Sequence, residues 1–220
     1  MGYDDAVATR DYGQYCGLAR ALDLVGERWG LLIVRDLLCG PLRFGELQSG
    51  LVGIPSNVLT NRLKELEAGG VIERVLLAAP ARGTAYALTE AGRSLEATLV
   101  ALGRWGAARL GDLRQGEVVT AGSFAMALRT TFRPGAARAG ERVAYEVRMG
   151  DVVVGAIVQD HAVTVTVGAL DDPDVVVETG PAIKAVMAGD LTPDEAVAGG
   201  AVTITGSKRA WRRFPDLFRI

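Results

Sequence analysis

The spacing of apolar residues changes near residue 115, and this change limits the folds that the chain can adopt. Before that point apolar side chains recur mostly every three or four residues, as in amphipathic helices. After about residue 120 much of the pattern alternates, as in strands with one buried face. The 220 residues can form two small cores. We therefore predict an α+β protein with domains at 1–115 and 116–220, joined by the polar, glycine-flanked segment 111–117.

Short helical segments precede a hairpin pattern in the first domain. Gly40-Pro41 and Gly69-Gly70 mark helix ends, and Thr89 is a helix-capping residue. The predicted elements are helices at 18–25, 29–38, 44–47 and 55–68, strands at 71–77 and 84–88, and a long helix at 89–110. Helix, turn, helix and hairpin in this order predict a winged helix-turn-helix domain.

The helix expected at 55–68 has leucines on one side and a polar face on the other. The polar side chains are spaced so that they share one face, and they are Ser56, Asn57, Thr60, Asn61 and Lys64. Such side chains match the base edges of the DNA major groove, which admits one helix. Phosphate or minor-groove contacts are expected from Arg43, Arg62 and Arg82. The alternative is a solvated helix in a domain that contacts another protein.

Charge and composition restrict the classes of function. The formal charge is −2, and residues 1–115 hold 13 basic and 13 acidic residues, so any DNA contact must come from a local patch. Two cysteines, one histidine and the lack of a phosphate-binding loop predict no metal, no cofactor and no enzyme activity. The acidic start and short apolar runs predict a cytoplasmic protein without membrane contact.

The long helix at 89–110 carries more apolar residues on one side than a small domain needs. These residues predict a homodimer contact, and they are Leu95, Leu99, Leu102 and Leu110.

Four motifs carry a resemblance to a known family over about residues 12–110. They are CGLARALDLVGERWGLLIVRDLL at 16–38, GPLRFGEL at 40–47, VLTNRLKEL at 58–66 and YALTEAGR at 86–93. In these motifs the chain resembles the HxlR family of bacterial transcription regulators. The resemblance implies a homodimer, formed by the N-terminal segment and the helix at 89–110, on a roughly palindromic operator. Pro55 and Gly83 depart from the family pattern, which often has a hydroxyl residue and a wing arginine there.

Cys16 matches the N-terminal cysteine of that family, which in some members senses oxidants or electrophiles. The resemblance makes Cys16 a candidate redox residue. The alternative is a small buried side chain, because no resolving cysteine is visible near it. Cys39 is expected in the core.

The second domain combines strand patterns with later helices. Strands are predicted at 124–132, 143–149, 152–158, 163–167, 175–178 and 201–205, and helices at 181–188, 191–197 and around 210–217, giving one sheet with helices on one face. The segment 174–206 is similar to sterol-carrier-protein-type lipid-binding domains, which implies an apolar cavity. Candidate lining residues are Phe124, Met126, Tyr145, Val147, Ile157, Val165, Met187, Trp211 and Phe214. The alternative is that they fill the core.

Together these features predict a transcriptional regulator, specifically a repressor, that binds double-stranded DNA as a homodimer under the control of a small apolar ligand. The alternative is a lipid carrier or protein-interaction module whose winged helix does not bind DNA.

Overall fold

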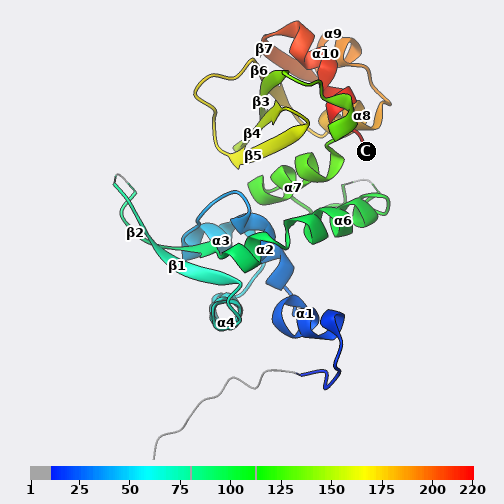
Figure 1. The fold of residues 1–220 in the computed structure, drawn as a ribbon. Helices are drawn as coiled ribbons and strands as arrows, with labels where there is room; N and C mark the ends of the chain where they lie inside the picture. The colour runs from blue at the N-terminus through cyan, green and yellow to red at the C-terminus, as the bar shows by residue number, and fades with distance from the viewer. Residues whose placement is uncertain (1–10, 80, 112) are drawn as a thin grey trace, which may run out of the picture. The chain divides into compact units, whose positions relative to one another are not determined.

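The computed structural model describes residues 11–79, 81–111 and 113–220 of the chain (Figure 1). It has two compact units, Met1–Leu99 and Val100–Ile220. The units divide before the segment at 111–117 that we predicted as the linker. Arg104 belongs to the second unit, where its Nε donates to the carbonyl of Thr130 at 2.8 Å.

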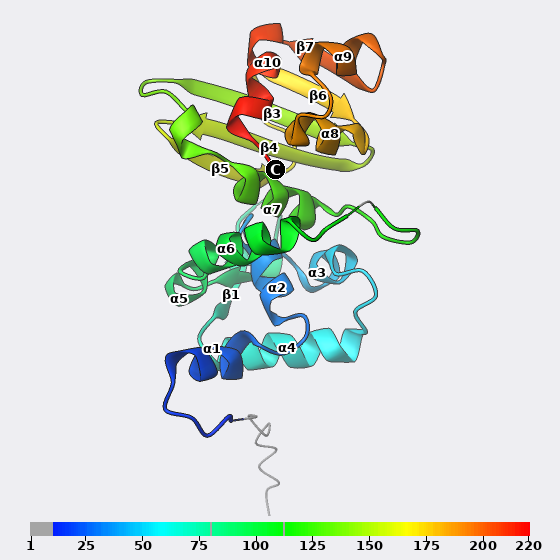
Figure 2. The same ribbon diagram turned by 90° about the vertical axis from the view of Figure 1, so that its right-hand side faces the viewer.

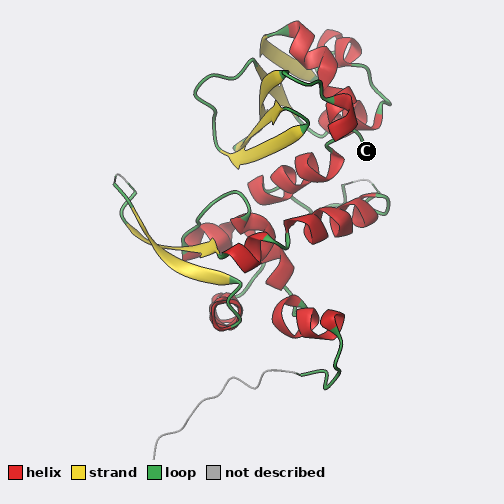
Figure 3. Ribbon diagram, in the orientation of Figure 1, coloured by secondary structure: helices red, strands yellow, loops and turns green. Residues whose placement is uncertain are grey.

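The first unit has the element order that its sequence predicts, and Figure 3 shows the two-stranded hairpin among the helices. Its fully buried side chains, which include Ile33, Leu47, Leu59 and Leu63, come from three different helices and form one core. Its elements are α1 (Gly17–Val25), α2 (Gly30–Leu37), α3 (Phe44–Gly50), α4 (Ser56–Ala68), β1 (Ile72–Leu77), β2 (Gly83–Leu88) and α5 (Glu90–Arg93).

The prediction of one long helix at 89–110 was wrong, because the helix is interrupted. Thr89 does cap the start, accepting a hydrogen bond from Gly92 N at 3.1 Å, but α5 ends at Arg93 and α6 spans Glu96–Ala107. Gly92 fits against the backbone just before β1: a Cβ there would lie 2.1 Å from the carbonyl oxygen of Val71. This close approach fixes the short first helix beside the hairpin.

The second unit contains a five-stranded sheet in the order β5-β4-β3-β6-β7, in which only β3 and β6 pair in parallel (Figure 2). Helix α7 packs against β4 and β5, and α10 packs against β6. The elements are α7 (Ala121–Thr131), a 3-10 turn η1 (Pro134–Ala136), β3 (Arg142–Met149), β4 (Val152–Gln159), β5 (Ala162–Val167), β6 (Val175–Thr179), α8 (Ala182–Ala188), α9 (Pro193–Ala198), β7 (Val202–Gly206) and α10 (Lys208–Leu217).

The strand predicted at 124–132 is instead helix α7, and this is the main correction in the second unit. Phe124, Leu128 and Phe132 are spaced by four residues, so they also fit a helix with one buried side. A reciprocal cap decides the outcome, since Ser123 N donates to Thr120 Oγ1 at 3.2 Å and Thr120 N donates to Ser123 Oγ at 2.9 Å. The other predicted strands and helices of this unit are present, with small shifts at their ends.

Aromatic side chains fill the core between the sheet and α10. The ring of Tyr145 meets those of Phe214 and Phe218 edge-on, with ring centroids 5.3 and 5.9 Å apart. The polar atoms of two of these aromatic side chains are satisfied: Tyr145 Oη donates to Ala210 O and Trp211 Nε1 donates to Pro193 O, both at 2.9 Å. Burial raises the pKa of Tyr145, so its hydroxyl remains protonated. Within the described ranges, no helix has the length and apolar character that a membrane crossing requires.

Candidate nucleic-acid interface

Helix α4 presents the polar face that the sequence predicts. Leu59, Leu63 and Leu66 are buried against the first unit, which fixes the rotation of the helix. The opposite face is exposed at all five predicted positions: Ser56, Asn57, Thr60, Asn61 and Lys64. The helix begins after Pro55, whose φ of −66° suits a helix start. The side chains needed to contact base edges therefore stand together on one solvent-facing surface.

Two details determine which of these side chains are free to bind. Thr60 Oγ1 donates to Ser56 O at 2.8 Å, so its hydroxyl hydrogen is already used within the helix. Lys64 and Asn61 make no hydrogen bond or ion pair with another residue of the described chain. The side chains of Ser56 and Asn57 likewise have no hydrogen bond among the described residues, so Ser56, Asn57, Asn61 and Lys64 are the donors of this face that remain available to a partner.

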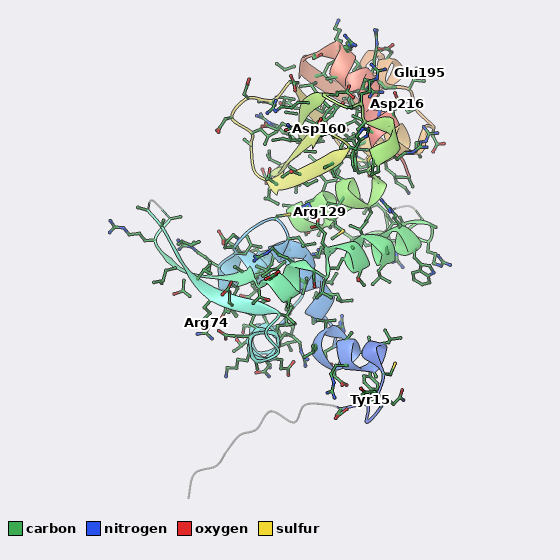
Figure 4. The ribbon with its side chains drawn as sticks, in the orientation of Figure 1. Tyr15, Arg74, Arg129, Asp160, Glu195 and Asp216 are labelled. Carbon is green, nitrogen blue, oxygen red and sulfur yellow. The ribbon has the colours of Figure 1, made fainter. Side chains whose placement is uncertain are left out.

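Arg62, expected to contact phosphate, is used inside the protein. Its guanidinium forms an ion pair with Glu65, one turn along α4, and another with Glu27 at 3.8 Å. The second acidic residue at the end of α4, Glu67, pairs with Arg74 at 3.2 Å. Arg74, which Figure 4 labels, also lies over the ring of Tyr86, with its guanidinium carbon 5.6 Å from the ring centroid. The carboxylates near the C-terminal end of α4 are thus neutralised by arginines.

Arg43 has a structural contact that the sequence did not reveal. Its Nη2 donates to the carbonyl oxygens of Ala81 at 3.0 Å and Arg82 at 2.7 Å, so it holds the tip of the hairpin. Gly83 follows this contact with a φ of +132°, a backbone conformation that favours glycine. The side chain of Arg82 is exposed and forms no hydrogen bond or ion pair within the described part of the chain. Of the three arginines predicted to contact DNA, Arg82 is the one whose guanidinium is not bonded to the protein.

The leucines predicted at a dimer contact differ in exposure. Leu99 is buried and Leu95 is half-buried, whereas Leu102 and Leu110 are 49% and 67% exposed. Sequence reasoning missed further exposed apolar side chains near α1, which are Tyr12, Tyr15, Leu18 and Leu22. Figure 4 marks Tyr15 before the start of α1. Because a soluble monomer rarely exposes so many large apolar side chains together, these residues are candidates for a contact with another chain.

Cys16 is exposed, which excludes the alternative of a buried side chain. It occupies the N-cap position of α1, and the backbone N–H groups of Ala19 and Leu18 lower the pKa of its thiol. Cys39 lies just past the end of α2 and is half-buried rather than fully in the core.

The nine residues predicted to line an apolar cavity all lie in the second unit. Seven of them are buried in its core, and Met126 and Ile157 are half-buried. Their placement agrees with the alternative that they fill the core. A cleft of about 940 Å³ does occur in this unit, but it lies elsewhere and none of the nine lines it.

Comparison with known proteins places the similarity in the first part of the chain. A family model described as HxlR-like helix-turn-helix matches residues 24–113. The uncharacterized HTH-type transcriptional regulator Rv3095 of Mycobacterium tuberculosis is 47% identical over 89 residues, which are 40% of this chain and 56% of that protein. The chain therefore spans little more than half the length of this relative.

Two relatives from Bacillus subtilis are covered more fully. The uncharacterized HTH-type transcriptional regulator YvaP is 37% identical over 86 residues, 39% of this chain and 80% of that protein. The HTH-type transcriptional regulator YodB is 38% identical over 85 residues, 39% of this chain and 76% of that protein. The solved structure of reduced YodB superposes with a TM-score of 0.39 and 34% identity over 45% of this chain and 100% of that one.

Proposed function

The chain belongs to the HxlR-like helix-turn-helix family of transcriptional regulators, and we propose that it binds double-stranded DNA through the exposed face of α4. The observation that carries the proposal is the cluster of exposed polar side chains on α4, in which Asn61 and Lys64 have no partner among the described residues. Asparagine can form a bidentate contact with adenine and lysine can donate to guanine. Arg82 at the hairpin tip supplies a phosphate or minor-groove contact.

The proposed regulator acts as a homodimer in the cytoplasm. Two recognition helices about 34 Å apart would reach successive major grooves, which matches a roughly palindromic operator. A dimer contact would cover exposed apolar side chains, which are Leu18 and Leu22 of α1 in the first unit and Leu102 and Leu110 in the second. We propose that this dimer acts as a repressor.

The second unit has the proposed role of an effector domain. A ligand that prefers one arrangement of the dimer would change the spacing of the recognition helices, and a coupling of about 1–3 kcal/mol is enough for regulation. The sterol-carrier-like pattern at 174–206 supports a small apolar ligand.

A DNA-binding experiment tests the proposal. Fluorescence anisotropy with the region upstream of the chain's own gene measures affinity at several salt concentrations. We expect binding that weakens with salt, and a loss of about tenfold or more in Asn61→Ala and in Lys64→Ala, because one good base contact contributes ~1–3 kcal/mol. Lys208→Ala is the matched control, since Lys208 is exposed on α10 in the second unit.

Failure of that experiment would favour the second candidate function. If the wild-type protein shows no salt-dependent binding to any native promoter fragment, the chain is a lipid carrier or protein-interaction module. If Lys208→Ala weakens binding as much as Lys64→Ala, the contact is a general charge effect and α4 does not read sequence.

A further inference from the structure

The cleft of the second unit is lined by four arginine side chains. It has a volume of about 940 Å³ and is formed by the end of α6, the end of α7, η1 and the C-terminal part of α10. Its charged lining residues are Arg104, Arg133, Arg213, Arg219 and Asp216. Figure 4 marks Asp216 on α10. A volume of this size suits a small organic molecule.

A short backbone pairing directs two of these arginines to the cleft. Phe132 and Phe218 form an isolated antiparallel bridge, and both rings are buried, with centroids 5.9 Å apart. Neighbouring residues of extended chains point to opposite faces, so Arg133 and Arg219 lie on the face opposite the rings. Both are exposed and line the cleft.

The arginines of the cleft differ in how far the protein already uses them. Arg104 donates to the carbonyl oxygens of Thr130 at 2.8 Å and Phe132 at 3.4 Å. Arg213 forms ion pairs with Glu141 at 3.0 Å and with Asp216 at 3.6 Å. The side chains of Arg133 and Arg219 form neither a hydrogen bond nor an ion pair within the described ranges.

The charges at the cleft do not cancel. The four arginines carry four positive charges, and the carboxylates of Asp216 in the lining and of Glu141, the partner of Arg213, carry two negative ones, which leaves a formal side-chain charge of 4 − 2 = +2. Gly189 has no side chain, and a Cβ there would lie 2.3 Å from the terminal nitrogens of Arg219, so the glycine makes room for this guanidinium. An arginine without a carboxylate partner offers a planar pair of donors that fits a carboxylate.

We propose that this cleft binds a small organic carboxylate, held by Arg133 and Arg219. The lining also contains Ala107, Ala108, Pro134 and Ile220, so the ligand would have an apolar body beside its anionic group. The apolar body lies against these residues while the two guanidinium groups bind the carboxylate. The claim that this ligand is the effector of the regulator rests on the proposed function. The claim that it binds to the cleft does not.

Calorimetric titration of the full chain with 4-phenylbutyrate tests the site. We expect binding of 4-phenylbutyrate, at least tenfold weaker binding of the neutral 4-phenylbutanol, and about tenfold weaker binding of 4-phenylbutyrate to Arg133→Gln and to Arg219→Gln. Arg209→Gln is the matched control, because Arg209 is an exposed arginine of α10 that does not line the cleft. Circular dichroism checks that each variant is folded.

Several results would overturn the proposal. They are equal binding of the acid and the alcohol, an unchanged affinity in both cleft variants, and an equal loss in Arg209→Gln. Displacement of 4-phenylbutyrate by a DNA duplex of unrelated sequence would show that the cleft contacts phosphate groups of DNA, and would also overturn it.

The same samples separate this proposal from the proposed function. DNA affinity is measured by anisotropy with and without 4-phenylbutyrate. DNA binding without 4-phenylbutyrate binding refutes the cleft and leaves the regulator intact. Binding of 4-phenylbutyrate by a chain that binds no promoter fragment supports the cleft and refutes the regulator.

Discussion

The two units differ in which arginines they leave unbonded. In the first unit Arg43 and Arg62 are bonded to the protein itself. Arg43 holds the hairpin tip, and Arg62 pairs with a carboxylate between α1 and α2 and with another on α4. In the second unit Arg133 and Arg219 have no such partner in the part of the chain described. The comparison shows that an arginine in a recognition motif can be a structural contact, while arginines outside any motif remain available for a ligand.

The largest expected effect tests whether the two units have independent cores. Trp211→Ala removes a side chain that is 1% exposed, and we expect the second unit to lose about 3–5 kcal/mol of unfolding free energy. Urea unfolding followed by circular dichroism measures this loss. DNA affinity should stay unchanged, because α4 and the hairpin belong to the first unit.

Val167→Ala is the control for that experiment. Val167 is 45% exposed on the edge strand β5, so its truncation should change the unfolding free energy by only about 0.5 kcal/mol. A fall in DNA affinity that parallels the loss of stability in Trp211→Ala would show that the units do not act independently.

A second test concerns the structural use of Arg43. Arg43→Ala removes two hydrogen bonds from a charged donor, each contributing ~1.5–3 kcal/mol, so the hairpin tip should open more often. Trypsin cleavage after Arg82 should then become about tenfold faster or more, measured by mass spectrometry over time. Arg209→Ala should leave this rate at the wild-type value. Equal cleavage rates in Arg43→Ala and the wild type would contradict the clamp.

A third test compares a paired with an unpaired arginine of the first unit. Arg82→Ala should reduce the slope of log affinity against log salt by about one, because one phosphate contact is lost. Arg62→Ala should leave the slope nearly unchanged, since Arg62 pairs with Glu65 and Glu27. The reverse pattern would mean that Arg62 leaves its carboxylate partners when DNA binds.

The smallest expected effect is a shift in the reactivity of Cys16. The nearby N–H groups of Ala19 and Leu18 favour the thiolate and lower the pKa, so alkylation should become fast at a lower pH than for a free cysteine. Iodoacetamide labelling across a pH series, read by peptide mass spectrometry, measures the midpoint. The Cys16→Ser variant retains Cys39, so its labelling gives the background that comes from Cys39. A midpoint at or above that of N-acetylcysteine would contradict this prediction.

Much of the secondary structure could be predicted because local patterns specify it. Leu59, Leu63 and Leu66 set the buried side of α4 and therefore its exposed polar face. The segment of α7 could not be predicted in the same way, because Phe124, Leu128 and Phe132 fit both a strand and a helix. The capping pair Thr120 and Ser123 was the signal that could have decided between them.

The sequence by itself determined the two-part organisation, the winged-helix order of elements and the residues on the exposed face of α4. Periodicity and capping act over a few residues, so they can be read along the chain. Only the tertiary structure decided which arginines are already bonded and that Arg133 and Arg219 share a cleft. These outcomes depend on contacts between distant segments, such as Arg43 with Arg82 and Phe132 with Phe218, which no local pattern specifies.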